Sequence, residues 1–238
     1  MTEGGVRVSD VKPPPERLYG RPRGHTLRPR QERLLQAALP RLRFPVEKAS
    51  DPASVFGKIP DQIWLEVGFG GGEHSLAQHD AHPDVGYIAS EVFENGLCSL
   101  LSRVVPSGQE ETSSVPDMLK LWDDDARVLL KALPEASLDR MFLMFPDPWP
   151  KARHAKRRFV HPHNIALVAR ALKPGAVWRV ASDDPTYQQW VEDVMAEQTF
   201  FITAPPAQER PENWFPTRYE AKAIAAGRQP LYWTFTRR

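Results

Sequence analysis

From Asp61 to the C-terminus, short apolar runs alternate with stretches of helical character, and this alternation restricts the fold more than any other feature of the chain. The apolar runs are expected strands, at 63–67, 85–92, 118–122, 138–145 and 176–182. The expected helices lie between and after them, at 73–80, 95–104, 124–133, 162–172 and 185–198. Strands that alternate with helices form a parallel sheet covered on both faces. We therefore expect an α/β fold.

The two ends of the chain depart from this alternation. Residues 200–203 and 231–236 have strand character, and a proline-rich loop and a helix-like stretch at 218–226 separate them. We expect these two late strands to pair antiparallel. Near the N-terminus, residues 31–39 are expected to form a short helix that Pro40 stops.

Basic residues are concentrated in two segments, although the net charge of the whole chain is only +1. Residues 1–48 hold eleven Lys and Arg against five Asp and Glu, and residues 151–158 hold five cations and no acid. Such clusters favour a polyanionic partner, because they displace counterions from phosphates. Residues 1–30 are also rich in proline and lack apolar periodicity, so we expect a flexible basic arm before a single domain of residues 31–238.

Composition argues against several classes of protein. We expect neither a membrane span nor secretion, because the chain has no run of eighteen apolar residues and no apolar signal region near its start. Cys98 is the single cysteine, which excludes an internal disulfide and a cysteine-based zinc cluster. We therefore expect a cytoplasmic protein.

Glycines follow the first expected strand, in the segment 66–73, EVGFGGGE. Gly68, Gly70 and Gly72 allow a tight turn and the close approach of a nucleotide-type ligand at the start of the next helix. A dinucleotide fingerprint would have glycine where Glu73 stands, and a carboxylate there repels a pyrophosphate. S-adenosylmethionine has no phosphate and carries a sulfonium and an ammonium group, which suit Glu66 and the acid-flanked turn. We therefore favour S-adenosylmethionine over a nicotinamide dinucleotide.

Carboxylates also follow the second and third expected strands. Glu91 is placed to accept two hydrogen bonds from a ribose diol, although a strand-end glutamate that meets solvent is the alternative. Asp123, Asp124 and Asp125 are adjacent candidates for contact with an adenine amine. Each of these three aspartates is also able to cap the next helix.

The fourth expected strand runs into the segment 145–151, FPDPWPK. Its three prolines stiffen a turn that holds Asp147 and Trp149 at the carboxyl edge of the sheet, where ligands bind. An ionised carboxylate accepts both parallel donors of a guanine, the ring N–H and the exocyclic amine, which adenine cannot offer. Trp149 is free to stack on a base or to shield the cofactor. A rigid loop with an exposed acid is the structural alternative.

Further polar residues follow this turn and the fifth strand. The cations Lys151, Arg153, Lys156, Arg157 and Arg158 are expected to contact phosphates and to orient a nucleic acid without reading its sequence. Asp183 either binds substrate or caps the helix that begins near Pro185. Residues 217–220, TRYE, are by composition alone a polar cluster, either a lid or a helix start.

Three segments together resemble the bacterial tRNA (guanine-N7-)-methyltransferase family: 65–72 LEVGFGGG, 145–158 FPDPWPKARHAKRR and 217–220 TRYE. The resemblance extends from Ile63 to the C-terminus in the same order and spacing. It implies a Rossmann-like class I methyltransferase fold, an α/β three-layer sandwich with a seven-stranded, mostly parallel sheet and an antiparallel C-terminal strand. It also implies an enzyme that uses S-adenosylmethionine and no metal to methylate ring nitrogen 7 of the variable-loop guanosine of tRNA, at position forty-six.

The resemblance also implies residue roles by position, with Asp147 as the catalytic residue. Together with the glycine turn, it gives a predicted cofactor site of Glu66, Gly68, Gly70, Gly72, Glu91, Asp125 and Asp147. The predicted substrate site consists of Lys151, Arg153, Asp183, Thr217, Arg218, Tyr219 and Glu220. Two segments depart from the family. The stretch 106–116 is longer than the corresponding stretch of the family, and 117–120 DMLK replaces the family's Asn-x-Arg motif.

Three rival hypotheses arise from the residues themselves. A nicotinamide-dependent oxidoreductase is opposed by Glu73, and a non-catalytic RNA-binding protein of the same shape is opposed by the intact glycine turn and Asp147. A metal enzyme built on His74, His79 and His82 is opposed by their spacing, which does not place all three on one helical face. We expect tRNA as the partner, no membrane contact, and a monomer or a homodimer.

Overall fold

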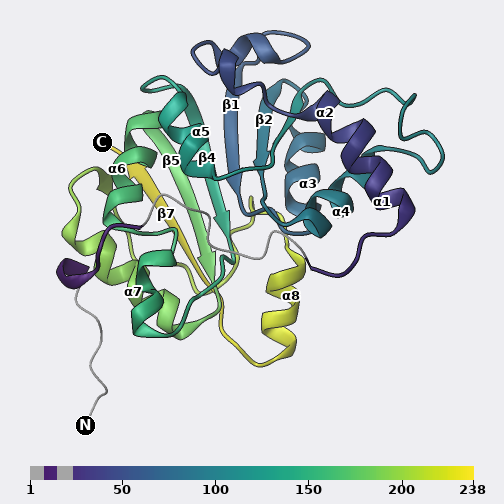
Figure 1. Ribbon diagram of the computed structural model, residues 1–238. Coiled ribbons are helices and arrows are strands. Elements are labelled where there is room, and N and C mark those ends of the chain that lie inside the picture. The colour runs from purple at the N-terminus through teal and green to yellow at the C-terminus, as the bar shows by residue number, and fades with distance from the viewer. Residues whose placement is uncertain (1–7, 15–23) are drawn as a thin grey trace.

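The apolar runs of the sequence form the strands of one sheet in the computed structural model, which describes residues 8–14 and 24–238 (Figure 1). β1 and β2 are buried along almost their whole length, which is typical of parallel strands covered on both faces. The strands are β1 (Gln62–Val67), β2 (Val85–Ser90), β3 (Leu119–Trp122), β4 (Leu138–Met144), β5 (Leu172–Ser182), β6 (Phe201–Ile202) and β7 (Leu231–Arg237).

The strand order is β3-β2-β1-β4-β5-β7-β6. All neighbouring pairs from β3 to β5 are parallel, and β7 runs antiparallel to both β5 and β6. This confirms the expected fold class and the antiparallel pairing of the two late strands. The order reverses between β1 and β4, and this switch point is where parallel sheets of this kind bind ligands.

Helices cover the two faces of the sheet in separate groups (Figure 1). α3 (Glu73–Ala81) and α4 (Glu94–Val104) lie on one face, where Leu100 packs in a core cluster with Tyr87 and Phe142. The other face carries α5 (Ala126–Ala132), α6 (Pro162–Ala171) and α7 (Pro185–Glu197), and its core cluster contains Trp178 and Trp190. α8 (Arg218–Ala225) lies beyond the arrowheads of the strands, at the carboxyl edge.

The expectation that Pro40 stops the first helix is wrong. The helical path runs through α1 (Pro29–Arg33), a π-helical stretch η2 (Leu34–Ala38) and α2 (Leu39–Leu42). Pro40 lies in the first turn of α2, directly after this π-helical stretch, so the chain continues as a helix past the proline. In the π-helical stretch before it, the Leu39 N–H donates to the Leu34 carbonyl, five residues earlier. This wider turn changes which residues face the core after it.

Other boundaries differ by a few residues. β5 begins at Leu172, four residues before the expected strand, and α6 accordingly ends at Ala171. β6 contains only two residues. Element ends are the positions at which local sequence signals are weakest.

Part of the predicted N-terminal arm contacts the folded domain. Val8 is buried in the same core cluster as Trp178, and Val11 packs against that cluster. The Arg30 guanidinium contacts the buried carboxylate of Glu110 at 3.1 Å, which anchors α1 to the long stretch 106–116. Packing therefore begins before Gln31, whereas residues 1–7 and 15–23 of the predicted arm lie outside the described residues.

Within residues 8–14 and 24–238, no helix combines the length and the apolar character that crossing a bilayer requires.

Candidate active site

The loops that follow β1, β2 and β4 meet at the carboxyl edge of the sheet. β1 pairs with β2 on one side and with β4 on the other, so their carboxyl ends are neighbours. This position is the switch point of the sheet, and it contains the glycine turn, Glu91 and the Asp147 turn. The sequence prediction therefore places these three features correctly with respect to the fold.

The glycine turn requires glycine at the three predicted positions. Gly68, Gly70 and Gly72 have φ angles of 74°, 60° and 82°, in the left-handed region that penalises residues with a Cβ. A Cβ at Gly70 would lie 2.8 Å from Cε2 of Tyr219, and a Cβ at Gly96 of α4 would lie 2.5 Å from the Gly70 carbonyl oxygen. The backbone of the turn is therefore enclosed by α4 and by the start of α8.

Glu91 is fixed at this turn by backbone donors. Its Oε2 accepts a hydrogen bond from the Gly70 N–H at 2.8 Å, and its Oε1 accepts from the N–H groups of Val92 and Phe93 at 2.8 and 3.0 Å. Burial raises the pKa of Glu91, the backbone donors oppose that shift, and the charge of Asp147 adds to it. Glu91 follows β2 and Asp147 follows β4, the two strands that flank β1, so both carboxylates belong to the same edge of the sheet.

Glu66 lies behind the glycine turn rather than at its open side. Its side chain is 1% exposed, and Oε2 accepts hydrogen bonds from Ser75 Oγ at 2.5 Å and from the Tyr87 hydroxyl at 2.8 Å. Oε1 lies 3.1 Å from Nδ1 of His74. Burial opposes ionisation of Glu66, but His74, Ser75 and Tyr87 outweigh it and hold the pKa of this carboxyl below its ordinary value. Glu66 therefore joins β1 to the first turn of α3, and a direct contact with the cofactor stays a prediction.

The three aspartates after β3 have different partners. Asp123 accepts a hydrogen bond from Arg43 at 2.8 Å. Asp125 caps α5 by accepting from the Arg127 N–H at 2.9 Å, and it also pairs with the Arg127 guanidinium. Asp124 is exposed, and its carboxylate accepts from the Asp125 N–H at 2.7 Å. Asp125 therefore caps α5, and a contact between Asp125 and the adenine stays a prediction.

Asp147 stands exposed at the tip of a strained turn. Phe145 and Trp149, one on each side of the Pro146–Pro148 tip, have φ angles of 53° and 44°. A left-handed conformation costs a residue with a Cβ about 1–2 kcal/mol. Such strain persists only where the surroundings impose it, and it is concentrated at functional sites.

Arg158 supplies part of that surrounding structure. Its Nε donates to the Pro148 carbonyl and its Nη2 to the Trp149 carbonyl, both at 3.1 Å, and its guanidinium lies 5.0 Å from the centre of the Trp190 ring. Only 4% of Arg158 is exposed. The expectation that Arg158 contacts phosphates is therefore wrong, because its donors are used inside the protein.

The rest of the basic run remains accessible. Residues 152–157 form a 3₁₀ helix, with Lys151 and Arg153 exposed at its start and Lys156 partly exposed. Arg157 lies over the Trp149 ring, 4.7 Å from its centre. The exposed cations therefore border the turn that carries Asp147.

Asp183 does not cap the helix that follows it, which was one of its two expected roles. Asp184, not Asp183, caps α7 by accepting a hydrogen bond from the Tyr187 N–H at 3.0 Å. The Asp183 carboxylate instead accepts from Arg228 Nε at 2.6 Å. The capping alternative for Asp183 is wrong, and its role toward substrate stays a prediction.

The segment Thr217 to Glu220 is a helix start whose four residues divide into two pairs. Thr217 and Glu220 are buried and form a reciprocal cap at the start of α8, and Glu220 also accepts from Arg210 at 3.0 Å and from Tyr232 at 2.6 Å. Arg218 and Tyr219 are exposed, and the Tyr219 ring lies at Gly70. The buried pair fixes the start of α8, and Tyr219 of the exposed pair lies against the glycine turn.

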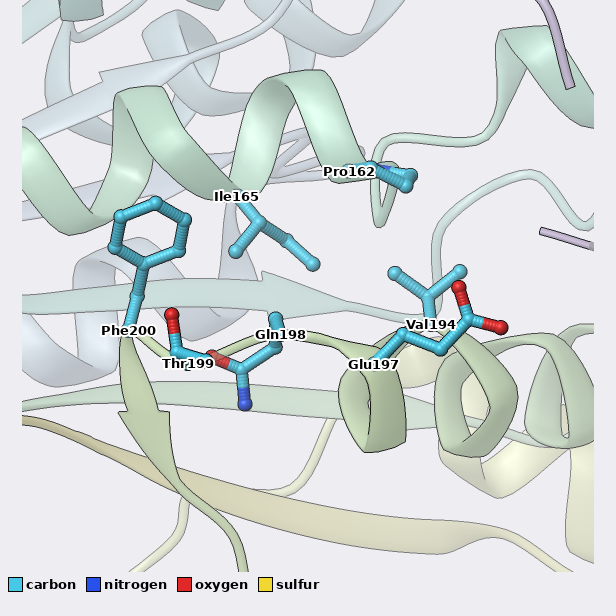
Figure 2. A pocket seen from close by; sticks show the side chains of 7 residues that line it. All are labelled: Pro162, Ile165, Val194, Glu197, Gln198, Thr199 and Phe200. Atoms are coloured by element: carbon cyan, nitrogen blue, oxygen red, sulfur yellow. The ribbon is translucent and has the colours of Figure 1, made fainter. Parts of the chain in front are cut away.

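His74 and His82 contact neighbouring side chains, and a pocket lined by α6, α7 and the residues after α7 contains no predicted site residue. His74 contacts Glu66, and the His82 ring lies against Trp64, 4.6 Å between centres. No group of three His, Cys, Asp or Glu side chains in the described part of the chain is arranged to hold a metal ion. A pocket of about 220 Å³ is lined by the residues of Figure 2, Pro162, Ile165, Val194, Glu197, Gln198, Thr199 and Phe200, none of which was a predicted site residue.

Sequence reasoning missed two contributors to the site. Gly96 allows α4 to touch the glycine turn, and its signal was a glycine inside an otherwise helical stretch. Arg158 gave no signal of its own, because it is one of five cations in a short segment.

Comparisons with known proteins agree with this arrangement. Residues 60–232 match a family model described as a putative methyltransferase. The tRNA (guanine-N(7)-)-methyltransferase of Granulibacter bethesdensis is 65% identical, over 96% of this chain and 98% of that protein. The chain belongs to the tRNA (guanine-N(7)-)-methyltransferase family.

Other comparisons support the family and its fold. The family member from Rhodospirillum rubrum is 46% identical over 93% of this chain and 88% of its own length. Among solved structures, the 16S rRNA methyltransferase KamB has a TM-score of 0.56 at 16% identity and covers 78% of this chain and 90% of its own. An antibiotic-related methyltransferase has a TM-score of 0.51 at 13% identity, over 81% and 94% of the two chains.

The enclosed backbone of the glycine turn generates a first prediction. Gly70→Ala introduces strain at a positive φ and a clash with Tyr219, so we expect the affinity for S-adenosylmethionine, measured by calorimetry, to fall at least about tenfold. Gly175→Ala is the matched control, because Gly175 of β5 also has a positive φ, 79°, but a Cβ added there would meet no atom within 4 Å. Equal affinities of the two variants would contradict the assignment.

The buried contacts of Glu66 generate a second prediction. Its pKa is lowered on folding, so its stabilising effect is present at neutral pH and is lost as the pH falls below about 4. Glu66→Gln should therefore lower the free energy of unfolding by about 2 kcal/mol at pH 7 and flatten the acid limb of the stability profile. Denaturant unfolding between pH 3 and pH 7 measures both effects, and parallel profiles for the two proteins would refute the role.

Proposed function

We propose that this protein transfers the methyl group of S-adenosylmethionine to ring nitrogen 7 of the variable-loop guanosine of tRNA, at position forty-six. The observation that carries the proposal is the meeting of two turns at the switch point of the sheet, the glycine turn that holds Glu91 and the strained turn that carries Asp147, in a chain 65% identical to a tRNA (guanine-N(7)-)-methyltransferase. One carboxylate then serves the cofactor and the other serves the base.

The cofactor side of the crevice suits S-adenosylmethionine, which supplies a methyl group on a positively charged sulfur. Glu91 offers carboxylate oxygens to a ribose diol, and the glycine turn lets the ligand lie against bare backbone. Glu73, which pairs with Arg103, occupies the first turn of α3, where a dinucleotide would place its pyrophosphate. Asp125 is the residue we assign to the adenine end, and the exposed Asp124 is its alternative.

Asp147 binds the guanine in this proposal. Its exposed carboxylate accepts hydrogen bonds from the ring N–H and the exocyclic amine, which selects guanine over adenine. Nitrogen 7 carries a lone pair and no proton, so the reaction needs no base, and alignment of the nitrogen with the methyl group supplies most of the rate. The negative charge of Asp147 also offsets the positive charge that develops on the methylated ring.

Exposed side chains around the crevice bind the polynucleotide. Lys151 and Arg153 contact phosphates, while Arg218 and Tyr219 of α8 approach the nucleotide from the opposite side. Thr217 and Glu220 act by fixing the start of α8, and Asp183 completes the substrate side. A cytoplasmic location and a monomer or homodimer complete the proposal.

Asp147→Asn tests the role of this carboxylate. The variant places an amide donor against the donors of guanine, so we expect kcat/KM to fall by about 100-fold or more, while the affinity for S-adenosylmethionine changes less than about threefold. The assay uses unmodified tRNA and labelled S-adenosylmethionine, followed by mapping of the labelled base.

Glu135→Gln removes an exposed acid in the loop before β4, at the other end of that strand from the Asp147 turn, and serves as the control. Near-normal turnover of Asp147→Asn would remove Asp147 from the mechanism. A label at any position other than nitrogen 7 of the variable-loop guanosine would overturn the proposed function.

The salt dependence of binding tests the phosphate contacts. For the double variant Lys151→Ala, Arg153→Ala, the slope of log Kd for tRNA against log salt should be smaller by about 1.5, because two counterion-releasing contacts are lost. Lys173→Gln is the control, since Lys173 pairs with Asp139 at the start of β5, away from the carboxyl edge. An unchanged slope in the double variant would show that these cations do not contact the RNA.

A further inference from the structure

The turn that carries Asp147 cannot hold its own shape through backbone hydrogen bonds. Pro146, Pro148 and Pro150 have no N–H group, and the Phe145 N–H is used outside the turn, on the Ala181 carbonyl at 2.8 Å. Both flanking residues, Phe145 and Trp149, are in the left-handed region. The conformation must therefore be imposed by groups outside the turn.

Arg158 is such a group. Its two hydrogen bonds reach consecutive carbonyls, those of Pro148 and Trp149, and these are the first two carbonyls after Asp147. A planar guanidinium presents two parallel donors in a fixed geometry, which a lysine ammonium does not. Burial lowers the pKa of Arg158, and the facing Tyr187 and Asp184 oppose this shift.

The guanidinium is in turn connected to α7. It lies 5.0 Å from the centre of the Trp190 ring, and the neighbouring Val160 is held by two side chains of the same helix. The Trp190 indole N–H donates to the Val160 carbonyl at 2.6 Å, and the Val160 N–H donates to the Tyr187 hydroxyl at 3.2 Å. A continuous set of contacts therefore runs from α7 through Arg158 to the Asp147 turn.

We propose that Arg158 is a positioning residue for the methyl transfer: its guanidinium fixes the two carbonyls after Asp147 against α7 and so sets where the Asp147 carboxylate presents itself to the base. Arg158 acts through Asp147 and touches neither RNA nor cofactor. The effect of Arg158 on catalysis rests on the proposed function. The effect of Arg158 on the turn rests on its hydrogen bonds alone.

Arg158→Lys is the direct test, because it keeps the charge and loses the paired donors. We expect kcat to fall about 30-fold or more, since small misplacement of a reacting group is costly, while KM for tRNA and the affinity for S-adenosylmethionine change less than about threefold. Hydrogen exchange should accelerate at the Phe145 and His154 amides, which donate to the Ala181 and Lys151 carbonyls at the two ends of the turn. The exchange measurement does not depend on activity. If the wild-type protein failed to methylate tRNA, the proposed function would be wrong, but the exchange measurement would still test whether Arg158 holds the turn.

Arg170→Lys is the matched control, because Arg170 likewise donates to several loop carbonyls, those of Leu130, Lys131 and Leu133, away from the site. It should lower the melting temperature without changing kcat or exchange in the Asp147 turn. Trp190→Phe, which loses the hydrogen bond to Val160, provides a second variant should Arg158→Lys fail to fold, and we expect a smaller loss of kcat in the same direction. Either of two results would overturn the proposal. The first is a rise in KM for tRNA with unchanged kcat in Arg158→Lys. The second is a kcat and an exchange rate equal to those of the wild type in both Arg158→Lys and Trp190→Phe.

Discussion

Two neighbouring parallel strands, β1 and β4, end in loops of opposite character, and the site depends on their meeting. The loop after β1 is made of glycines in a left-handed conformation, which gives a ligand access to the backbone. The loop after β4 is made of prolines, which gives one exposed carboxylate a fixed position. The strand order reverses between β1 and β4, and this is the position at which sheets of this kind bind ligands.

Burial separates the charged residues around this space into two groups. Glu66, Glu220 and Arg158 are at most 5% exposed, and each uses its polar atoms to hold a turn or a helix start in place. Asp147, Lys151, Arg153 and Arg218 are exposed, and we assign them to the ligands. A buried charge without partners is costly, so the first group depends on the hydrogen bonds that hold these turns and helix starts in place.

The fold and the position of the site were largely predictable from the sequence, because strand periodicity and the glycine and proline turns are local signals. The partners of charged residues were not, since they depend on contacts between distant segments. Arg158 and Arg153 stand in the same basic run, but only the folded chain places one under Trp190 and leaves the other in solvent. Likewise, the acid at the end of β1 was predicted at the cofactor, whereas His74, Ser75 and Tyr87 occupy its oxygens. Pro40 misled the prediction because a π turn compensates for it.

A crystal structure with S-adenosylhomocysteine bound tests the central claim most directly. The account predicts that a Glu91 carboxylate oxygen lies within about 3 Å of a ribose hydroxyl and that the Asp147 carboxylate faces the sulfur across the same crevice. A ligand bound elsewhere, for example in the pocket of Figure 2, or an Asp147 side chain directed away from the sulfur, would contradict it.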